Sequence, residues 1–475
     1  MRSLTRDSFK VTFVTPHVGR KDPSNLKEYV RTWQMGNLPV ATLCGLTPKD
    51  VEIGFYDERL EFINFDDPTD LVAITIETYN AKRAYEVAAE YRKRGVPIIM
   101  GGYHATLVPE EVSQYADSIL VGFAEGVWDE VIRDAQKGQL KPRYQRPEYM
   151  PIRFGMPDRT IFGGRDYMDL SLVETGRGCP QHCNFCTITT ATGARYYPRP
   201  IDEIVADIAQ IKAAKLPKNI FFVDDNIVGN IKYAKDLFRA LAPLKIRWFS
   251  QGTMNMARDE ELLQLMADSG CVGLLVGFES LNKQTLIEMD KKINVPFIDD
   301  IRASVDKLHQ HGICIYGTFI FGYSETVEDF QRTARAAMHM RLFMAAFNPL
   351  TPFPGTRLYH QLIAEGRLKD PQWYLDPEYR FGRIPFEPKF MTERQLREAT
   401  LDARRQFYSW KGIAKRATNV KGNLTNLVKA GGYLYINWEL QREINDKDGL
   451  PLGNLPERPV PPKPEVRERV YTITI

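Results

Sequence analysis

The chain has 475 residues, of which 43% are hydrophobic and 26% are charged, a composition typical of ordinary globular proteins. This length predicts two or three domains, and the formal net charge of +3 is too small to indicate a nucleic-acid partner. The sequence contains no run of about 18 apolar residues, so we expect no membrane span. The N-terminal residues lack the pattern of a signal peptide. We therefore expect a cytoplasmic, monomeric protein.

The first 140 residues alternate short apolar strands with helical stretches such as Ala81–Arg94. The predicted strands are Val11–Thr15, Val51–Asp57, Leu71–Ile76, Ile98–Met100 and Ile119–Val121. This alternation favours an α/β fold over residues 1–140, with a doubly wound, Rossmann-like parallel sheet that binds ligands at the carboxyl ends of its strands.

Residues 141–170 are rich in proline and arginine and predict a linker. A second series of strands and helices follows over residues 171–391. Its predicted strands are Ser171–Glu174, Asn219–Asp224, Arg247–Gln251, Gly273–Gly277, Ile315–Phe321 and Ala346–Leu350, and its helices span about 201–214, 231–241, 259–269, 298–312 and 326–340. Six such units in a row predict a partial (β/α)6 barrel of the TIM type.

Residues 392–475 predict a small helical region and an extended, proline-rich tail. Basic residues alternate with apolar and aromatic ones between 392 and 429; they are Arg397, Arg404, Arg405, Lys411, Lys415 and Arg416. Two interpretations stay open. The basic residues form a solvated face of a helix packed on the barrel, or they dock on a membrane surface or an anionic substrate.

Three cysteines lie within eight residues in the segment ETGRGCPQHCNFC, at Cys179, Cys183 and Cys186. Three thiolates leave one iron of a four-iron cluster without a protein ligand. A structural zinc site needs a fourth ligand, and the only local candidate, His182, stands too close to Cys183. An electron-carrier cluster needs a fourth cysteine, and none lies within about 80 residues. The spacing therefore favours a cluster with an open iron.

The motif Cys-x-x-x-Cys-x-x-Cys in the first loop of a predicted partial barrel resembles the radical SAM superfamily. This resemblance implies a [4Fe-4S] cluster whose open iron binds S-adenosylmethionine (SAM). It also implies an external electron donor of the flavodoxin or ferredoxin type, and a 5'-deoxyadenosyl radical that abstracts hydrogen from a substrate.

The same resemblance implies a set of SAM contacts at the ends of successive strands. They are Phe185 near the adenine, Asp225 at the amino group, Gln251 after the third strand, Glu279 and Ser280 at the ribose, Phe319 in the strand by the adenine, and Arg195 and Arg199 at the carboxylate. Each polar residue of this set has the alternative role of capping a helix. The segment Tyr323-Ser324-Glu325-Thr326 departs from the family's Pro-Gly-Glu/Asp-Thr.

An open α/β sheet before such a barrel resembles the cobalamin-binding domain of cobalamin-dependent radical SAM enzymes. The strongest match is the segment Met100-Gly101-Gly102-Tyr103-His104-Ala105, because paired glycines after a strand allow close approach to a flat ligand. The implied cobalamin contacts are Thr75, Glu77, Gly101, Gly102, Tyr103, His104 and Gly122.

Two segments depart from the cobalamin-binding pattern. Thr15-Pro16-His17-Val18-Gly19 lacks the aspartate of Asp-x-His-x-x-Gly, so we expect the lower face of cobalt to lack a histidine ligand. Gly122-Phe123-Ala124-Glu125-Gly126 replaces the usual Gly-Glu-Gly-Glu. The alternative is a domain that kept the fold and lost the cofactor.

The resemblance favours methyl transfer to an unactivated carbon of a small-molecule or lipid substrate, with possible peripheral contact to a membrane. The alternative is a ring-forming or oxidative radical SAM enzyme of porphyrin, hopanoid or other natural-product metabolism, because fold does not determine reaction. Tyr316 and Tyr323 are candidates for relaying a proton or hydrogen atom, with packing as the alternative role. An iron–sulfur sensor or a methylthiotransferase of RNA fits the sequence less well, since the latter needs a second set of three cysteines.

Overall fold

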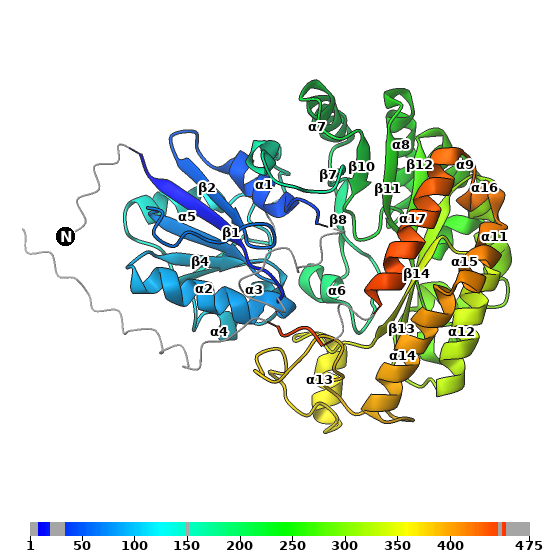
Figure 1. Cartoon of the computed structure of the whole chain (residues 1–475). Helices are drawn as coiled ribbons and strands as arrows, with labels where there is room; N and C mark the ends of the chain where they lie inside the picture. The colour runs from blue at the N-terminus through cyan, green and yellow to red at the C-terminus, as the bar shows by residue number, and fades with distance from the viewer. Residues whose placement is uncertain (1–7, 20–33, 149, 151, 445–448, 453–475) are drawn as a thin grey trace, which may run out of the picture.

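The protein is a mixed α/β structure with two parallel sheets (Figure 1). The computed structural model describes residues 8–19, 34–148, 150, 152–444 and 449–452. Figure 1 shows the blue N-terminal sheet and the green second sheet side by side, with the helices of the C-terminal region, in orange and red, against the second sheet. Within the described residues, no helix is long and apolar enough to cross a membrane.

The first sheet has six parallel strands in the order β2-β1-β3-β4-β5-β6. Their bounds are β1 Lys10–Thr15, β2 Glu52–Asp57, β3 Leu71–Thr75, β4 Ile98–Gly101, β5 Ser118–Val121 and β6 Arg143–Gln145. Five of these strands are at the places predicted from the sequence. All six residues of β1 are buried, because helices cover both faces of a parallel sheet of this kind.

The helices of this unit divide the apolar strand residues between two clusters. Phe13 and Leu71 pack with residues of α1 and α5, whereas Val14 and Val72 pack with residues of α2. This division follows from the alternation of side chains along a strand. The helix bounds are α1 Leu38–Leu46, α2 Ala81–Lys93, α3 Tyr103–Leu107, α4 Pro109–Val112 and α5 Trp128–Gln136, with the 3-10 turn η3 at Thr78–Asn80.

The strand β6 was not predicted, because it lies within the stretch 141–170 that the sequence analysis assigns to a linker. Arg143–Gln145 pairs in parallel with β5 at the edge of the sheet. Only Tyr144 is buried, between two exposed polar residues, and its hydroxyl donates a hydrogen bond to Asp134 at 2.7 Å. An edge strand with one buried side chain has no apolar run to detect. The other predicted domain limits stay predictions.

The second sheet also has six parallel strands, in the order β14-β13-β12-β11-β10-β7. Their bounds are β7 Ser171–Val173, β10 Asn219–Phe222, β11 Arg247–Gly252, β12 Cys271–Glu279, β13 Cys314–Phe321 and β14 Met344–Pro349. The helices after them are α7 Ile201–Ala213, α8 Ile231–Leu241, α9 Glu260–Asp268, α10 Lys283–Glu288, α11 Ile301–Gln310, α12 Val327–His339 and α13 Arg357–Ala364. All six strands are at the predicted places, in chain order.

The C-terminal region is helical, as predicted, with α14 Glu393–Phe407, α15 Trp410–Ala417, α16 Val420–Asn423 and α17 Leu427–Glu443. One of its predicted surface cations is a core residue. The guanidinium of Arg416 is fully buried, lies 3.8 Å from the centroid of the Phe407 ring and donates hydrogen bonds to three backbone carbonyls. The predicted proline-rich tail lies mostly outside the described residues.

The two units are joined by the carboxylate of Glu111, which follows β4 in the first sheet. It accepts hydrogen bonds from Tyr85 at 2.8 Å, from Gln372 at 3.2 Å and from the hydroxyl of Tyr374. Nearby, the ring of Tyr79 packs against the rings of three residues after β14, namely Phe353, Trp373 and Phe381. These contacts hold the first unit against the segment that follows the last strand of the second sheet.

Candidate functional site

The three clustered cysteines lie on a loop that is closed at its base by a short hairpin. The strands β8 Gly176–Gly178 and β9 Tyr196–Pro198 pair antiparallel, and the helix α6 Thr187–Thr192 follows the last cysteine. A Cβ atom on Gly176 would lie 2.2 Å from the Tyr196 hydroxyl, and one on Gly178 would lie 2.3 Å from a backbone carbonyl oxygen. The glycines therefore allow the two strands to approach each other closely.

A single buried ammonium group stands close to the thiols. Lys291 is 8% exposed, and its Nζ lies 3.3 Å from Glu279 Oε1. Burial alone would lower the pKa of Lys291, but Glu279 and the three thiols outweigh burial and raise it, so the lysine stays charged. Burial raises the pKa of Cys183 to about 12, and Lys291 opposes that shift. In the described part of the chain, no three His, Cys, Asp or Glu side chains converge closely enough to hold one single metal ion.

Lys291 was missed by the sequence analysis, which assigned two arginines to this role. Arg199 is 2% exposed, and its guanidinium donates to Asp207 at 2.9 Å, so this arginine holds α7 against the hairpin. Arg195 has 61% of its side-chain surface exposed, and its nearest acidic partner is Glu148 at 3.9 Å. Neither contact directs an arginine to the cysteine loop. Lys291 follows a short helix about 100 residues after the cysteines, so no local motif identifies it.

Two aspartates follow β10 and hold the hairpin in place. Asp224 accepts hydrogen bonds from the backbone N–H of Thr175 at 3.1 Å and from its hydroxyl at 2.7 Å. Asp225 accepts one from the N–H of Gly178 at 2.8 Å. Burial raises the pKa of Asp224 to about 8 and that of Asp225 to about 6. Asp225 therefore changes its charge near neutral pH, at the base of the cysteine loop. Gln251, the residue before the last of β11, is half-buried.

Glu279 ends β12 in a strained conformation. Its φ angle is +62°, where the pairing of β12 with β13 shifts register, and such a backbone costs about 1–3 kcal/mol for a residue other than glycine. A Cβ atom on Gly277 would lie 2.2 Å from Glu279 Oε1, so Gly277 makes room for this carboxylate. The hydroxyl of Ser280 accepts a hydrogen bond from the N–H of Asn282 at 3.2 Å. Ser280 thus shapes the turn before α10.

Phe319 does not face the site, contrary to the sequence prediction. It is fully buried and stacks between Phe278 and Phe347, with ring centroids 5.4 Å apart on each side. Phe347 in turn packs on Phe407 of α14, so this row belongs to the helical face of the sheet. Side chains alternate along a strand, and Ile320 therefore takes the opposite face, where it lines a cavity.

A cavity of about 330 Å³ opens between the cysteine loop, the ends of β13 and β14, and α14. Phe185 of the cysteine loop lines it, as does Tyr79 of the first unit. The remaining lining residues are Ile320, Asn348, Pro349, Leu350, Thr351, Phe353, Tyr379, Phe381, Gly382, Arg383, Arg397, Thr400, Leu401 and Arg404. Most of this lining is apolar or aromatic, and it includes three arginines and no aspartate or glutamate.

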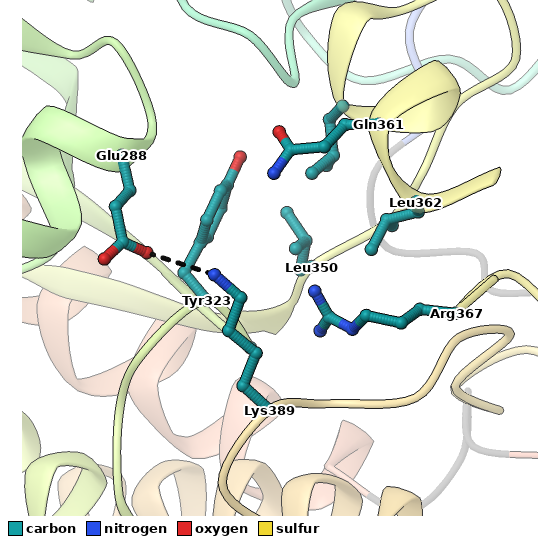
Figure 2. Close-up of a pocket in the computed structure, with 9 residues that line it drawn as sticks. Glu288, Tyr323, Leu350, Gln361, Leu362, Arg367 and Lys389 are labelled. Carbon is teal, nitrogen blue, oxygen red and sulfur yellow. Dashed lines mark ion pairs between the residues drawn. The ribbon is translucent and has the colours of Figure 1, made fainter. Parts of the chain in front are cut away.

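Tyr323 lies behind the cysteine loop, next to a smaller cavity of about 150 Å³. Figure 2 shows its ring between Glu288 on one side and Leu350 and Gln361 on the other, with Glu288 paired to Lys389. The hydroxyl of Tyr323 donates a hydrogen bond to Asn184 Oδ1 at 2.6 Å, within the cysteine loop. This contact indicates that Tyr323 positions the loop. Tyr316 is half-buried on the same strand face as Ile320, and its role as a relay stays a prediction.

The carboxyl edge of the first sheet faces the cysteine loop. Gly102 has a φ angle of +104°, and a Cβ atom on it would lie 2.7 Å from the carbonyl oxygen of Ile76, so only glycine allows β3 and the start of α3 to meet here. Tyr103 is 36% exposed, yet burial raises its pKa and Asp225 and Cys186 add to that shift. Tyr103 therefore lies where the first unit meets the cysteine loop, within electrostatic reach of Asp225 and Cys186.

Other predicted residues of this edge differ in their surroundings. Glu77, two residues after β3, is exposed, and Thr75 is half-buried beside Gly102. A Cβ atom on Gly122 would meet nothing within 4 Å, so Gly122 presents its backbone to open space, whereas a Cβ atom on Gly101 would contact Leu120 at 3.7 Å.

His104 is not accessible at this edge of the sheet, contrary to the sequence prediction. It is fully buried, with Nδ1 3.2 Å from Thr78 Oγ1 and Nε2 3.3 Å from Glu111 Oε1. These contacts give His104 a structural role in the interface between the units.

Arg177 in the hairpin joins the two units directly at the site. Its guanidinium donates to Glu125 of the first unit at 2.9 and 3.1 Å and to Glu174 of the second at 2.7 Å. It also lies 4.6 Å from the centroid of the Phe123 ring. The two acids outweigh the effect of burial and raise the pKa of Arg177. The segment after β5 that departs from Gly-Glu-Gly-Glu thus supplies partners for this arginine.

Comparison with known protein families identifies residues 173–337 by the family model described as the Radical SAM superfamily. The chain is 32% identical over 391 residues to bacteriochlorophyllide d C-12(1)-methyltransferase from Chlorobaculum tepidum, covering 79% of this chain and 83% of that protein. It is 29% identical over 415 residues to bacteriochlorophyllide d C-8(2)-methyltransferase from the same organism, covering 82% and 90% of the two chains.

Two solved structures share the fold over most of the chain. The radical S-adenosylmethionine methyltransferase TsrM from Kitasatospora setae, with cobalamin and a [4Fe-4S] cluster bound, aligns with a TM-score of 0.63 at 17% identity, covering 92% of this chain and 99% of that one. The cobalamin-dependent radical enzyme OxsB aligns with a TM-score of 0.64 at 14% identity, covering 93% and 72%. At these identities the likeness shows a common fold.

The contact between Tyr323 and Asn184 leads to a prediction for Tyr323→Phe. We expect the free energy of unfolding to fall by about 1 kcal/mol, because a buried amide oxygen loses its hydrogen bond, with a matching fall in the thermal midpoint measured by calorimetry. Tyr435→Phe, at an exposed tyrosine, is the control and leaves the midpoint unchanged. An unchanged midpoint in Tyr323→Phe contradicts the positioning role.

Proposed function

Because the chain belongs to the radical SAM superfamily, we propose that it is a cobalamin-dependent enzyme that transfers a methyl group to an unactivated carbon of a small, largely apolar substrate. The N-terminal unit is then a Rossmann-like cobalamin domain, and the second unit is a partial (β/α)6 barrel. The relatives named as methyltransferases support this reaction, and the likeness to cobalamin-dependent enzymes supports the domain assignment.

One observation carries the proposal: residues at the carboxyl edges of the two sheets lie close together where the two units meet. Tyr103 of the first unit and Asp225 of the second influence each other electrostatically there, and Arg177 bridges the units beside them. Ligands of parallel α/β folds bind at the carboxyl ends of the strands. Two ligands bound at these two edges would therefore lie close to each other between the two units.

The residues around the cysteines fit a [4Fe-4S] cluster. Cys179, Cys183 and Cys186 influence one another and Lys291 electrostatically, so the four side chains form one cluster of groups. Three thiolates and sulfides give a net negative charge, and the ammonium of Lys291 balances part of it. The amide of Asn226 also points a donor to Cys179 Sγ at 3.7 Å, and donors to sulfur of this kind tune iron–sulfur clusters.

The edge of the first sheet fits a large flat cofactor such as cobalamin. Gly122 leaves its backbone open, and Tyr103 and Glu77 are exposed at the same edge of the sheet. His104 is held by Thr78 and Glu111. This arrangement agrees with the expectation that cobalt lacks a histidine ligand from the segment at Gly101 and Gly102.

In this assignment the cluster and SAM supply a radical that removes hydrogen, cobalamin supplies the methyl group, and an external flavodoxin- or ferredoxin-type protein supplies electrons. The chain's own residues bind and orient SAM and the substrate, and they enclose the site. Asp225 accepts the SAM ammonium group, and Lys291 replaces the predicted arginines as the cation for the SAM carboxylate. Phe185 separates the cluster loop from the substrate cavity, and the apolar lining of that cavity excludes water from the substrate.

The substrate cavity favours an apolar molecule that carries an acidic group. Its lining is mostly apolar, and Arg383, Arg397 and Arg404 are its charged residues. Part of the Arg404 guanidinium already binds the backbone, since it donates a hydrogen bond to the carbonyl of Phe347 at 2.9 Å. Arg397 comes from α14, one turn from Thr400 and Leu401, which line the same cavity. The sequence left two interpretations open for the basic C-terminal region. For α14 we therefore choose the one in which its basic residues bind an anionic substrate.

The function is tested by anaerobic reconstitution with iron, sulfide and hydroxocobalamin, followed by desalting and optical spectroscopy. We expect retained cobalamin absorption, cluster absorption and, after reduction with SAM, formation of 5'-deoxyadenosine. Cys183→Ala is expected to lose the cluster and 5'-deoxyadenosine while it keeps cobalamin, and Cys314→Ala, at a buried cysteine outside the loop, keeps all three. Loss of cobalamin from the wild-type protein on desalting would refute the cobalamin assignment.

A second test concerns the pH dependence of SAM binding. Asp225 has a pKa of about 6, and only its ionised form pairs with the SAM ammonium group. We expect SAM affinity, measured by anaerobic equilibrium dialysis, to fall as the pH drops below about 6. Asp225→Asn is expected to weaken binding about tenfold at neutral pH and to remove this dependence, because a charge-assisted hydrogen bond is lost. Asp236→Asn, on the outer helix α8, is the matched control. Equal affinity of wild type and Asp225→Asn at neutral pH contradicts the assignment.

A third test concerns the acidic group of the substrate. We would titrate apolar carboxylic acids and their methyl esters and follow tryptophan fluorescence, since Trp373 packs beside Tyr79 of the cavity wall. We expect each acid to bind about tenfold more tightly than its ester, and Arg397→Gln to remove the difference. Arg394→Gln, an exposed arginine of the same helix, is the control. Equal binding of acid and ester by the wild type would show that the cavity does not select for charge.

A further inference from the structure

The last helix, α17, is apolar on its outward face as well as on the face that packs against the protein. On the inner face, Tyr433 is buried and its hydroxyl donates to the carbonyl of Ile413 at 2.7 Å, and the amide of Asn437 donates to the carbonyl of Phe343 at 3.2 Å. On the outer face, large side chains stand in solvent. Leu427 is 92% exposed, Val428 73%, Leu434 54%, Tyr435 58% and Trp438 40%.

The outward residues form one continuous stripe. Successive residues of a helix are rotated by about 100°, so positions 427, 428, 431, 434, 435 and 438 fall within an arc about 120° wide. Asn437 and Tyr433 lie on the opposite side. A helix on the surface of a globular protein normally carries polar residues on its outer face, whereas this stripe has none from Leu427 to Trp438. We call these six residues the α17 stripe.

The stripe belongs to a strongly basic part of the chain. Residues 403–438 contain seven lysines and arginines and no aspartate or glutamate. Two of the seven serve inner roles, because Arg404 lines the substrate cavity and Arg416 is buried. Lys411 and Lys421 are exposed on α15 and α16. Just beyond the stripe, the guanidinium of Arg442 lies 4.7 Å from the centroid of the Trp438 ring.

We propose that the α17 stripe and the exposed lysines beside it dock the protein on the surface of an anionic lipid bilayer. An apolar helix face with tryptophan and tyrosine, flanked by lysine and arginine, suits the boundary between headgroups and acyl chains. The lysines add electrostatic attraction to an anionic surface. A second copy of the chain fits less well, since two such faces would bring like charges together.

This docking would place a lipid surface near the substrate cavity. Residues 449–452 follow α17 in the chain, and the carbonyl of Leu450 accepts a hydrogen bond from the N–H of Phe381 at 2.7 Å. Phe381 lines the substrate cavity. An apolar substrate dissolved in the bilayer therefore has its reservoir beside the enzyme. The docking itself does not depend on the methyl-transfer proposal, because it rests on the α17 stripe and on the exposed lysines of α15 and α16.

The test is flotation of the full-length, cofactor-reconstituted protein with vesicles of phosphatidylcholine, with or without phosphatidylglycerol. We expect binding to vesicles that contain phosphatidylglycerol, weakened by added salt. The double variant Leu434→Ser/Tyr435→Ser is expected to bind at least tenfold more weakly, and so is Lys411→Gln/Lys421→Gln. The control is Ile363→Ser/Phe390→Ser, which removes exposed apolar side chains outside α17 and is expected to leave binding unchanged.

All these substitutions are at exposed positions, so calorimetry should show an unchanged thermal midpoint. Binding of the wild type to neutral and anionic vesicles alike, or equal loss in the control variant, would overturn the proposal. Light scattering tests whether a second copy of the chain occupies the stripe instead. A dimer that forms without lipid and dissociates in Leu434→Ser/Tyr435→Ser would assign the stripe to that second copy. Failure of methyl transfer with intact flotation would refute only the proposed function.

Discussion

The guanidinium of Arg177 is the contact on which the geometry of the site depends. It is enclosed by protein and bonded to Glu125 of one unit and Glu174 of the other, in the hairpin that carries the cysteines. A buried arginine with two carboxylate partners is costly to leave with only one. The hairpin and the edge of the first sheet are therefore held together, and Tyr103 and Asp225 lie within electrostatic reach of each other as a consequence.

The electrostatics of the site follow from the same burial. Acidic groups at the ends of β10 and β12 are enclosed, so the pKa values of Asp224, Asp225 and Glu279 are all raised. Lys291 is the cation placed against the thiols and Glu279. An enclosed site of this kind strengthens interactions with charged groups of a ligand, which suits a cofactor that carries both an ammonium and a carboxylate group.

The basic residues of the C-terminal region lie in three different environments, although they occur in one continuous stretch of the sequence. Arg397 and Arg404 line the substrate cavity, Arg416 is buried among carbonyl groups and aromatic rings, and Lys411 and Lys421 remain at the surface. The two interpretations that the sequence left open thus apply to different residues. Our two proposals for this region, an acidic substrate at α14 and a lipid surface at α17, depend on this separation.

The sequence by itself determined eleven of the twelve strands of the two sheets, because their apolar runs and flanking glycines are local signals. It also indicated the cysteine motif and the family. Only the tertiary structure decided that Phe319 packs on helices while Ile320 lines the cavity, since one step along a strand reverses the face. The tertiary structure also gives Arg199 and His104 structural roles and places Lys291 close to the thiols. These roles depend on partners distant in the chain, which no local pattern encodes.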